Sequence, residues 1–262
     1  LCDIDRLRCA FSPFYAIHGM WGTEAFWGNY KTFFEGQGYR VITTNLRYHD
    51  IARKDDPDPR LGKVRLLDYA AHLEKEIAQL DEKPIIMGHS MGGLLTQILG
   101  SRDLGSALVA VTPAAPVGIF PVTPSVLQSF FSILTTWGFW HKPMRQKFSE
   151  ACYSMMHLLP PEKQKAEFEN FVHESGRAIA AIGLWMLGGG LDGRVDARKV
   201  TAPMLILSGK EDRITPVWVI RQIARKYKHA TYKEFPNHAH WIVSEPNWEE
   251  VAEYVAEWLK KQ

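Results

Sequence analysis

The sequence G-H-S-M-G places one residue, Ser90, where its hydroxyl could act as a nucleophile. Ser90 lies between a short apolar run at 84–88 and a helix-like run that ends near Leu99. A nucleophilic serine in such a strand-to-helix turn has strained backbone angles, and side chains two positions to either side would collide with the neighbouring strand and helix. Gly88 and Gly92 avoid that collision. The motif therefore predicts a hydroxyl exposed at the positive end of a helix, and the alternative is a glycine-rich turn with an incidental serine.

A serine hydroxyl is a weak nucleophile until a base takes its proton, and the base needs a carboxylate to orient it. The stretch MLILSGKEDRITP supplies carboxylates just after an apolar run at 204–207. Asp212 is the preferred acid because it directly precedes the loop that leads into a helix at Thr215, and Glu211 is its competitor. For either residue the alternative role is that of a solvated acid in a turn.

Two histidines compete for the role of the base. His238 and His240 both follow the last apolar run, in EFPNHAHWIVSEP, and their spacing does not separate them. His240 is preferred because the apolar pair Trp241 and Ile242 would bury one flank of its ring and fix it. The remaining histidines are interpreted as surface groups or supports of the site. The sequence lacks the H-x-x-x-H and H-E-x-x-H spacings that would predict a metal site, and no organic cofactor is indicated.

Short apolar runs that alternate with amphipathic stretches must position these residues. Six runs are predicted to be strands, at 14–19, 39–46, 84–88, 107–113, 202–209 and 230–236. The middle four are nearly apolar throughout, as expected of parallel strands covered on both faces. The alternation predicts an α/β fold with a doubly wound, mostly parallel sheet.

Three helices follow from apolar residues at helical spacing. The first covers 66–80 with one apolar face. The second begins with Thr215 as its N-cap and Pro216 at the first helical position, and the third begins after Asn247 as its cap.

Residues 116–194 break the alternation, because they contain helical stretches rich in Phe, Trp and Met but no clear strand. An insertion between two sheet strands is most simply a helical cap over the carboxyl edge of the sheet, where ligands of open α/β sheets bind. The predicted organisation is a core from 1 to 115, a cap from 116 to 194, and the remainder of the core from 195 to 262.

The cap predicts an apolar pocket, although the same side chains would also serve to pack helices on the sheet. Candidate substrate contacts are Trp21, Trp140, Trp185 and Trp241. No cluster of Arg or Lys is present to receive a charged leaving group. A neutral or weakly polar ester, a lactone or a monoacyl lipid is therefore the favoured substrate.

Composition excludes other classes of protein. In 262 residues, 31 basic and 29 acidic side chains give a net charge of +2, which is no signature of nucleic-acid binding. No apolar stretch reaches the roughly 18 residues of a membrane span. Three cysteines, Cys2, Cys9 and Cys152, make no disulfide framework and favour a reducing, cytoplasmic location. A homodimer is compatible with this composition.

The order Ser90, Asp212, His240, within GHSMGG, GKEDRITP and HAHW, resembles the α/β-hydrolase superfamily over nearly the whole chain. Within it the sequence is similar to capped esterases and lysophospholipase-like hydrolases. The resemblance implies an oxyanion hole formed by the backbone N–H groups of Met20 and Met91, with Trp21 as the alternative to Met20. The alternative to an oxyanion-hole role for HGMWG is a turn that only ends a strand. The chain departs from the family in the short segment before His18 and in LRYHD, which lacks the glycine-rich form of relatives.

These observations predict a serine hydrolase that cleaves carboxylic esters through an acyl-enzyme. Carbon–carbon bond hydrolases, acyltransferases and perhydrolases use the same three residues and stay open as alternatives. Ser90 argues against dehalogenases and epoxide hydrolases, which use an aspartate nucleophile. An alternative of another class is a receptor that retains the three residues but signals through its cap, and it would turn over very slowly and gain thermal stability with ligand.

Overall fold

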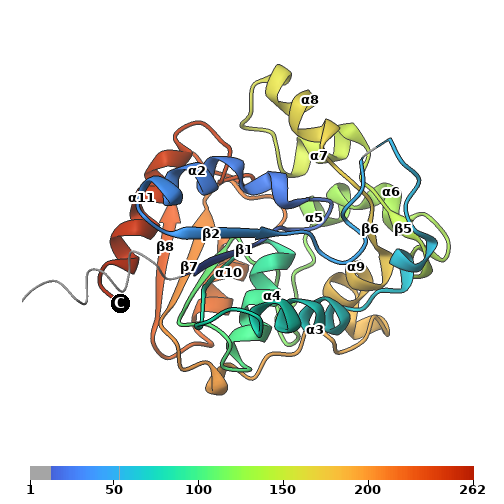
Figure 1. The fold of residues 1–262 in the computed structure, drawn as a ribbon. Coiled ribbons are helices and arrows are strands. Elements are labelled where there is room, and N and C mark those ends of the chain that lie inside the picture. Colours follow the sequence, from blue (N-terminus) through green and yellow to red (C-terminus); the bar gives the residue numbers. More distant parts are fainter. Residues whose placement is uncertain (1–12, 53) are drawn as a thin grey trace, which may run out of the picture.

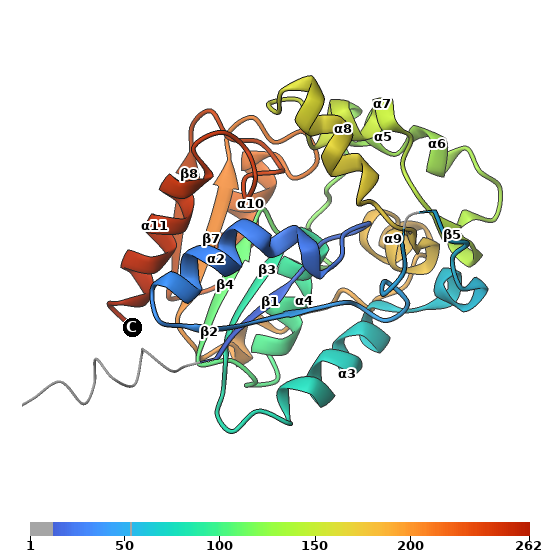
Figure 2. The same ribbon diagram turned by 45° about the horizontal axis from the view of Figure 1, so that its top comes forward.

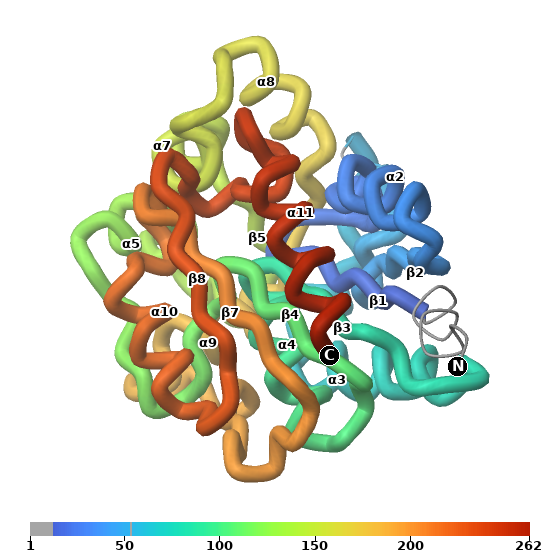
Figure 3. Tube along the Cα trace, turned by 90° about the vertical axis from the view of Figure 1, so that its left-hand side faces the viewer, coloured from blue at the N-terminus to red at the C-terminus, as the bar shows by residue number. Residues whose placement is uncertain are grey.

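The computed structural model describes residues 13–52 and 54–262, so the prediction for Cys2 and Cys9 lies outside the described residues. Its centre is a six-stranded parallel sheet with the order β2-β1-β3-β4-β7-β8, which Figure 3 shows from β8 across to β2. The strands are β1 (Pro13–Ile17), β2 (Arg40–Thr44), β3 (Ile85–His89), β4 (Ala107–Val111), β7 (Met204–Gly209) and β8 (Ala230–Phe235). Each lies within one of the six predicted runs or extends it by a single residue, and the α/β fold class is confirmed.

Helices cover both faces of the sheet (Figure 1). One face packs against α2 (Gly28–Gly36) and α11 (Trp248–Leu259), and the other against α3 (Leu66–Ile77), α4 (Met91–Gly100) and α10 (Val217–Ala224). The period of two in a strand divides the core between the faces. Val109 and Val111 of β4 pack with the α2 side, whereas Leu108 and Ala110 pack with the α4 side. Within the described residues, no helix is both long and apolar enough to cross a membrane.

The prediction of which strands are covered on both faces was right for three of four. Strands β3, β4 and β7 are buried along their whole length. Strand β2 is not, because the strand order places it at an edge of the sheet, where Arg40 is exposed. The fully buried fourth strand is β1, which lies between β2 and β3.

One predicted helix start is shifted by a residue in the structure, and the other is confirmed in position but lacks the capping contact. Pro216, not Thr215, occupies the N-cap position of α10, because the Thr215 hydroxyl is engaged by the neighbouring loop instead. Asn247 does precede α11, but its side chain makes no capping hydrogen bond and its backbone is left-handed, with φ of 64°. Asn tolerates that conformation better than most residues, which explains its place there.

The regular structure of the segment between β4 and β7 is mostly helical, and we refer to this segment as the cap (Figure 2). Its helices are α5 (Pro124–Ser129), α6 (Phe131–Leu134), α7 (Phe148–Ser154), α8 (Pro161–Glu169) and α9 (Gly176–Gly183). Contrary to the prediction, the cap also contains two-residue strands, β5 (Pro143–Met144) and β6 (Glu174–Ser175), which pair antiparallel. Such short strands leave no periodic pattern in the sequence. The boundaries at 116 and 194 stay a prediction.

Short 3-10 helices complete the chain at η1 (Glu24–Trp27), η2 (Pro59–Lys63), η3 (Phe139–His141), η4 (Trp185–Leu187) and η5 (Ala197–Lys199).

A buried carboxylate joins the cap to the core. Glu174 of β6 is fully buried and accepts hydrogen bonds from the Tyr69 hydroxyl at 2.6 Å and from the Ser175 amide at 2.5 Å. Its second oxygen lies 3.2 Å from His49 Nε2. Buried charged groups persist where they are paired and hydrogen-bonded, so this cluster holds β6 against the loop that follows β2.

Helix α9 offers a matched test of how closely the cap is packed. A Cβ added at Gly176 would lie 1.8 Å from the backbone oxygen of Phe139, whereas one added at Gly183 of the same helix would meet no atom within 4 Å. We expect Gly176→Ala to lower the free energy of unfolding by about 1–3 kcal/mol, because backbone must shift to make room. Gly183→Ala should be neutral or stabilising by up to about 1 kcal/mol. Urea unfolding of both variants tests this, and equal effects would contradict it.

Candidate active site

Ser90 lies in a sharp turn between β3 and α4, with φ of 54° and ψ of −116°. The turn is possible only because its neighbours lack side chains. A Cβ at Gly88 would lie 2.1 Å from the oxygen of Gly92, and one at Gly92 would lie 2.3 Å from the oxygen of Ile17. The elbow that the motif predicts is therefore present, and its glycines are needed for the steric reason given for them.

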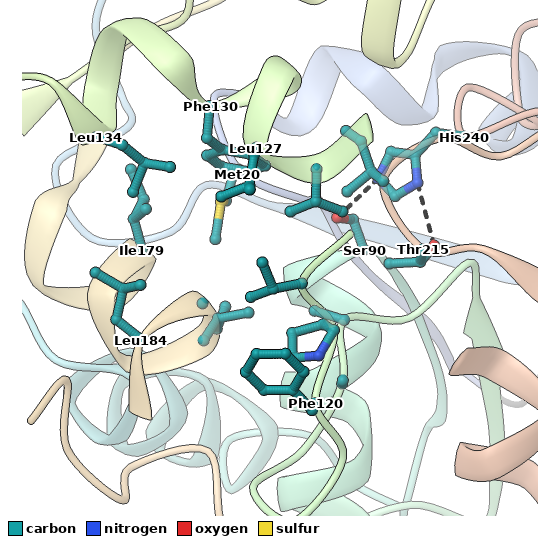
Figure 4. A pocket seen from close by; sticks show the side chains of 18 of the residues that line it. Met20, Ser90, Phe120, Leu127, Phe130, Leu134, Ile179, Leu184, Thr215 and His240 are labelled. Carbon is teal, nitrogen blue, oxygen red and sulfur yellow. Dashed lines mark hydrogen bonds between the residues drawn. The ribbon is translucent and has the colours of Figure 1, made fainter. Parts of the chain in front are cut away.

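The three residues predicted to act together do lie together, and Figure 4 shows two of them, Ser90 and His240. His240 Nε2 is 2.9 Å from Ser90 Oγ, and His240 Nδ1 is 2.8 Å from Asp212 Oδ2. Because a carboxylate only accepts, Nδ1 carries the proton, which leaves the Nε2 lone pair to accept the serine hydroxyl. All three side chains are buried at the carboxyl ends of their strands. The arrangement can move a proton from the hydroxyl to a base whose charge is balanced by an acid.

Asp212 is held by four donors. Its Oδ1 accepts the amides of Ile214 and Thr215, both at 2.8 Å, and its Oδ2 accepts the Thr215 hydroxyl at 2.7 Å in addition to His240. Burial on its own would raise the pKa of Asp212, but His240 and the Thr215 donors outweigh it and lower the pKa below its ordinary value of 3.8. The acid is therefore ionised wherever His240 can act as a base.

Thr215 is a member of the site that sequence reasoning assigned to helix capping. Its hydroxyl donates to Asp212 Oδ2 and lies 3.4 Å from His240 Nδ1, and it also lies 3.2 Å from the backbone oxygen of Thr112. The available sequence signal was its position three residues after the acid, because an Asp side chain commonly accepts backbone amides a few residues further along the chain.

The competing residues point elsewhere. His238 is buried against Glu245, with Nδ1 3.2 Å from Oε2, and Glu245 also accepts the amides of Ala239 and Trp241. This cluster fixes the loop that carries His240. Glu211 is exposed, and its amide donates to the backbone oxygen of His238.

Two further histidines, His18 and His89, hold the backbone of the loops around the site by hydrogen bonds. His89 Nε2 donates to the backbone oxygen of His240 at 2.7 Å, and His18 Nδ1 lies 2.8 Å from the oxygen of Gly19 while its Nε2 accepts the Leu46 amide at 3.0 Å. Burial lowers the pKa of each ring to about 3, so both are neutral near pH 7. Neither is a surface group. As neutral rings they position backbone without adding charge.

The loops named for the oxyanion hole approach Ser90 from two directions. Met91 is the first residue of α4, and the first amides of a helix have no partner within it. Met20 lines the same cavity as Ser90, and a Cβ at its neighbour Gly19 would lie 3.0 Å from Ser90 Cβ. Their role as donors stays a prediction.

A cavity of about 230 Å³ opens above Ser90, between the core and the cap (Figure 4). Its walls from the cap are aliphatic side chains of α5, α6 and α9 and aromatic side chains from the segments around them, and its polar groups are those of the site itself. Figure 4 shows Leu134, Ile179 and Leu184 across the cavity from Ser90 and His240. The lining is Met20, Trp21, His89, Ser90, Ala114, Ala115, Phe120, Pro121, Val122, Val126, Leu127, Phe130, Leu134, Phe139, Met155, Ile179, Ile182, Gly183, Leu184, Met186, Leu187, Ile214, Thr215 and His240.

Of the four predicted tryptophan contacts, Trp21 lines the cavity and three do not. Trp241 packs instead between Phe26 and Phe171, with ring centroids at 4.7 and 5.3 Å. Trp140 stacks edge-on with Trp137 and Phe139 within the cap. Trp185 begins η4, and its sequence neighbours reach the cavity in its place.

Aliphatic residues are the part of the lining that the sequence did not reveal. The composition of the cap pointed to aromatic and methionine side chains, and some of these, Phe120, Phe130, Phe139, Met155 and Met186, do line the cavity. It passed over the aliphatic side chains of α9, whose strong apolar face was the available signal. Across residues 13–52 and 54–262, no three His, Cys, Asp or Glu side chains are grouped as a metal site would need.

A parallel sheet with a serine elbow after β3, an acid after β7 and a histidine after β8 is the arrangement of the α/β hydrolases. Residues 15–254 match the model of the alpha/beta hydrolase family, and the chain belongs to that family.

Named relatives lie within this family. The chain is 28% identical over 183 residues to the monoacylglycerol lipase of Mycolicibacterium smegmatis, a match that covers 67% of this chain and 61% of the lipase, less than two thirds of its length. Among solved structures, the monoacylglycerol lipase of Paleococcus ferrophilus has a TM-score of 0.69 at 24% identity, covering 94% of this chain and 93% of that one. A pyrethroid hydrolase of Sphingobium faniae JZ-2 has a TM-score of 0.68 at 19% identity, covering 94% and 96%. At these identities the structural likeness concerns the fold.

The buried neutral histidines make stability depend on pH. The pKa of His89 falls from 6.5 to about 3 on burial, so below pH 6.5 the unfolded chain takes up a proton that the folded chain refuses. The contribution of His89 to the free energy of unfolding is therefore fully present above pH 6.5 and is lost as the pH falls toward 3. We expect the free energy of unfolding of His89→Gln to fall less steeply with falling pH than that of the wild type, by about 1.4 kcal/mol per pH unit between pH 6 and 4.

Urea unfolding at several pH values measures the effect. The matched control is His229→Gln, because the ring of His229 is exposed to solvent in the folded protein. An unchanged slope in His89→Gln would show that the buried ring is not the group that resists protonation.

Proposed function

We propose that this protein is a carboxylic ester hydrolase in which Ser90 attacks the acyl carbonyl and forms an acyl-enzyme. The observation that carries the proposal is the hydrogen-bonded series from Ser90 Oγ through His240 to Asp212 at the floor of an apolar cavity. His240 takes the serine proton and returns it to the leaving alcohol, and Asp212 stabilises the imidazolium. A water molecule then repeats the steps to release the acid.

The tetrahedral intermediate places a negative charge on the former carbonyl oxygen, which needs donors within the site. We assign this role to the amides of Met20 and Met91. Removing one such donor typically costs about 2.7–4 kcal/mol of transition-state stabilisation.

The cavity favours an acyl chain as the group that it binds. A volume of about 230 Å³ corresponds to roughly eight water-sized groups, and a methylene group is of similar size. No ionised side chain lines it. The apolar lining continues outward, since Phe120 is 52% exposed and Leu187 is 82% exposed at its mouth. A monoacyl lipid or a neutral ester of medium chain length matches this surface. Two of the similar proteins are monoacylglycerol lipases, which supports the same class.

Initial rates on p-nitrophenyl esters from acetate to palmitate, and on monoacylglycerols of matched chain length, test the proposal. Ser90→Ala should lower kcat on the order of 10⁴- to 10⁶-fold while leaving the melting temperature within a few degrees of the wild type. Substantial turnover by the folded variant would sink the assignment. Turnover by neither protein on any ester would favour the carbon–carbon hydrolase or receptor alternatives.

The far end of the cavity should set the chain-length optimum. Leu134→Phe adds volume opposite Ser90 and should move the optimum to a shorter acyl chain, with little change in the rate on acetate. The matched control is Leu67→Phe, which enlarges a leucine on α3 outside the cavity lining. The same optimum in both variants would show that another surface measures the chain.

A further inference from the structure

One residue of the loop after β1, Trp21, makes hydrogen bonds and a ring contact with the cap. Trp21 follows Met20 and has a left-handed backbone, with φ of 62°. For a bulky residue this conformation is strained and persists only where surrounding contacts impose it. Trp21 is 1% exposed, so its partners decide its geometry.

Three contacts join Trp21 to separate segments of the cap. Its backbone oxygen accepts the amide of Val172 at 2.9 Å. Its indole Nε1 donates to the backbone oxygen of Met144 in β5 at 3.1 Å. Its ring packs on Phe130, between α5 and α6, with centroids 5.6 Å apart. The cap therefore contacts both the backbone and the side chain of Trp21.

These partners are themselves fixed. Met144 pairs with Glu174 of β6, the carboxylate that is buried against Tyr69 and His49. On the other side of the loop, neutral His18 holds the oxygen of Gly19 to the core. The amide of Met20 thus lies between a residue anchored to the core and a residue anchored to the cap.

We infer that Trp21 is a positioning residue that transmits the position of the cap to the Met20 amide, and so to stabilisation of the oxyanion. This inference rests on the proposed ester hydrolysis. A cap that sits correctly over the substrate completes the oxyanion hole, and a displaced cap weakens it. The proposed effect of Trp21 on the transition state acts through the Met20 amide.

Trp21→Phe tests the inference, because it keeps an aromatic ring in the cavity wall and removes the donor to Met144. We expect kcat to fall about ten- to a hundredfold, the cost of a small misplacement in a catalytic group, with KM changed much less. The matched control is Trp137→Phe, which removes an indole from the same cap at a position 85% exposed. It should leave kcat unchanged.

A second readout separates oxyanion stabilisation from a general structural effect. Sulfur accepts hydrogen bonds poorly, so a thionoester gains little from the oxyanion donors while it uses the same pocket, nucleophile and base. The ratio of oxoester to thionoester rates should therefore fall in Trp21→Phe by about the same factor as kcat. Phe130→Leu, which loosens the ring contact and leaves the indole donor, should lower the ratio by a smaller factor and serves if Trp21→Phe does not fold.

The outcomes distinguish this inference from the proposed function. A wild type that hydrolyses no ester overturns the proposed function and with it the basis of the inference. A wild type with Ser90-dependent turnover whose rate ratio is unchanged in both Trp21→Phe and Phe130→Leu overturns the inference alone. An equal fall in Trp137→Phe also overturns it, because the effect would then belong to the cap in general.

Discussion

The backbone of Ser90 imposes the constraint on which the rest of this site depends. The positive φ of Ser90, at the end of a buried strand, directs its hydroxyl away from the sheet. The same turn brings α4 close to β1 and β3. Only glycine fits at positions 88 and 92, and the loop after β1 must also lie close, so position 19 has little room for a side chain. The strain is offset by the packing of an almost wholly buried strand and helix.

Charge in this site is confined to one pair. Asp212 is buried yet ionised because donors surround it, and among the described residues the histidine that hydrogen-bonds to it is His240. The other rings beneath the site, His18 and His89, are neutral and serve as directional hydrogen-bonding groups. As neutral rings, His18 and His89 therefore add no charge beside the Asp212–His240 pair.

The features that could be predicted from the sequence are those that patterns within a few residues determine. The six strands, the elbow at Ser90 and the order of acid and base follow from apolar runs and from glycines needed within a few residues. The choice between His238 and His240 needed more, since Glu245 settles it by binding the first of them. The edge position of β2 and the role of Thr215 likewise depend on which segments become neighbours in space. For the cavity, tryptophan content was a poor guide, because large rings such as Trp241 fill gaps between elements while aliphatic faces line the void.

The residues of this site are separated along the chain in a way that has a consequence during synthesis. The hydrogen bond between Ser90 and His240 closes a sequence separation of 150 residues, and His240 follows β8, which comes after the other strands of this sheet along the chain and lies at its edge. A growing chain can pair β1, β3 and β4 while the base is still inside the ribosome. Until His240 is in place, Ser90 lacks the base that would activate it, and the cavity lacks part of its lining. A nascent chain of this kind is protected from premature chemistry by the order of its strands, yet it exposes the cavity walls to unwanted association until the last strand docks.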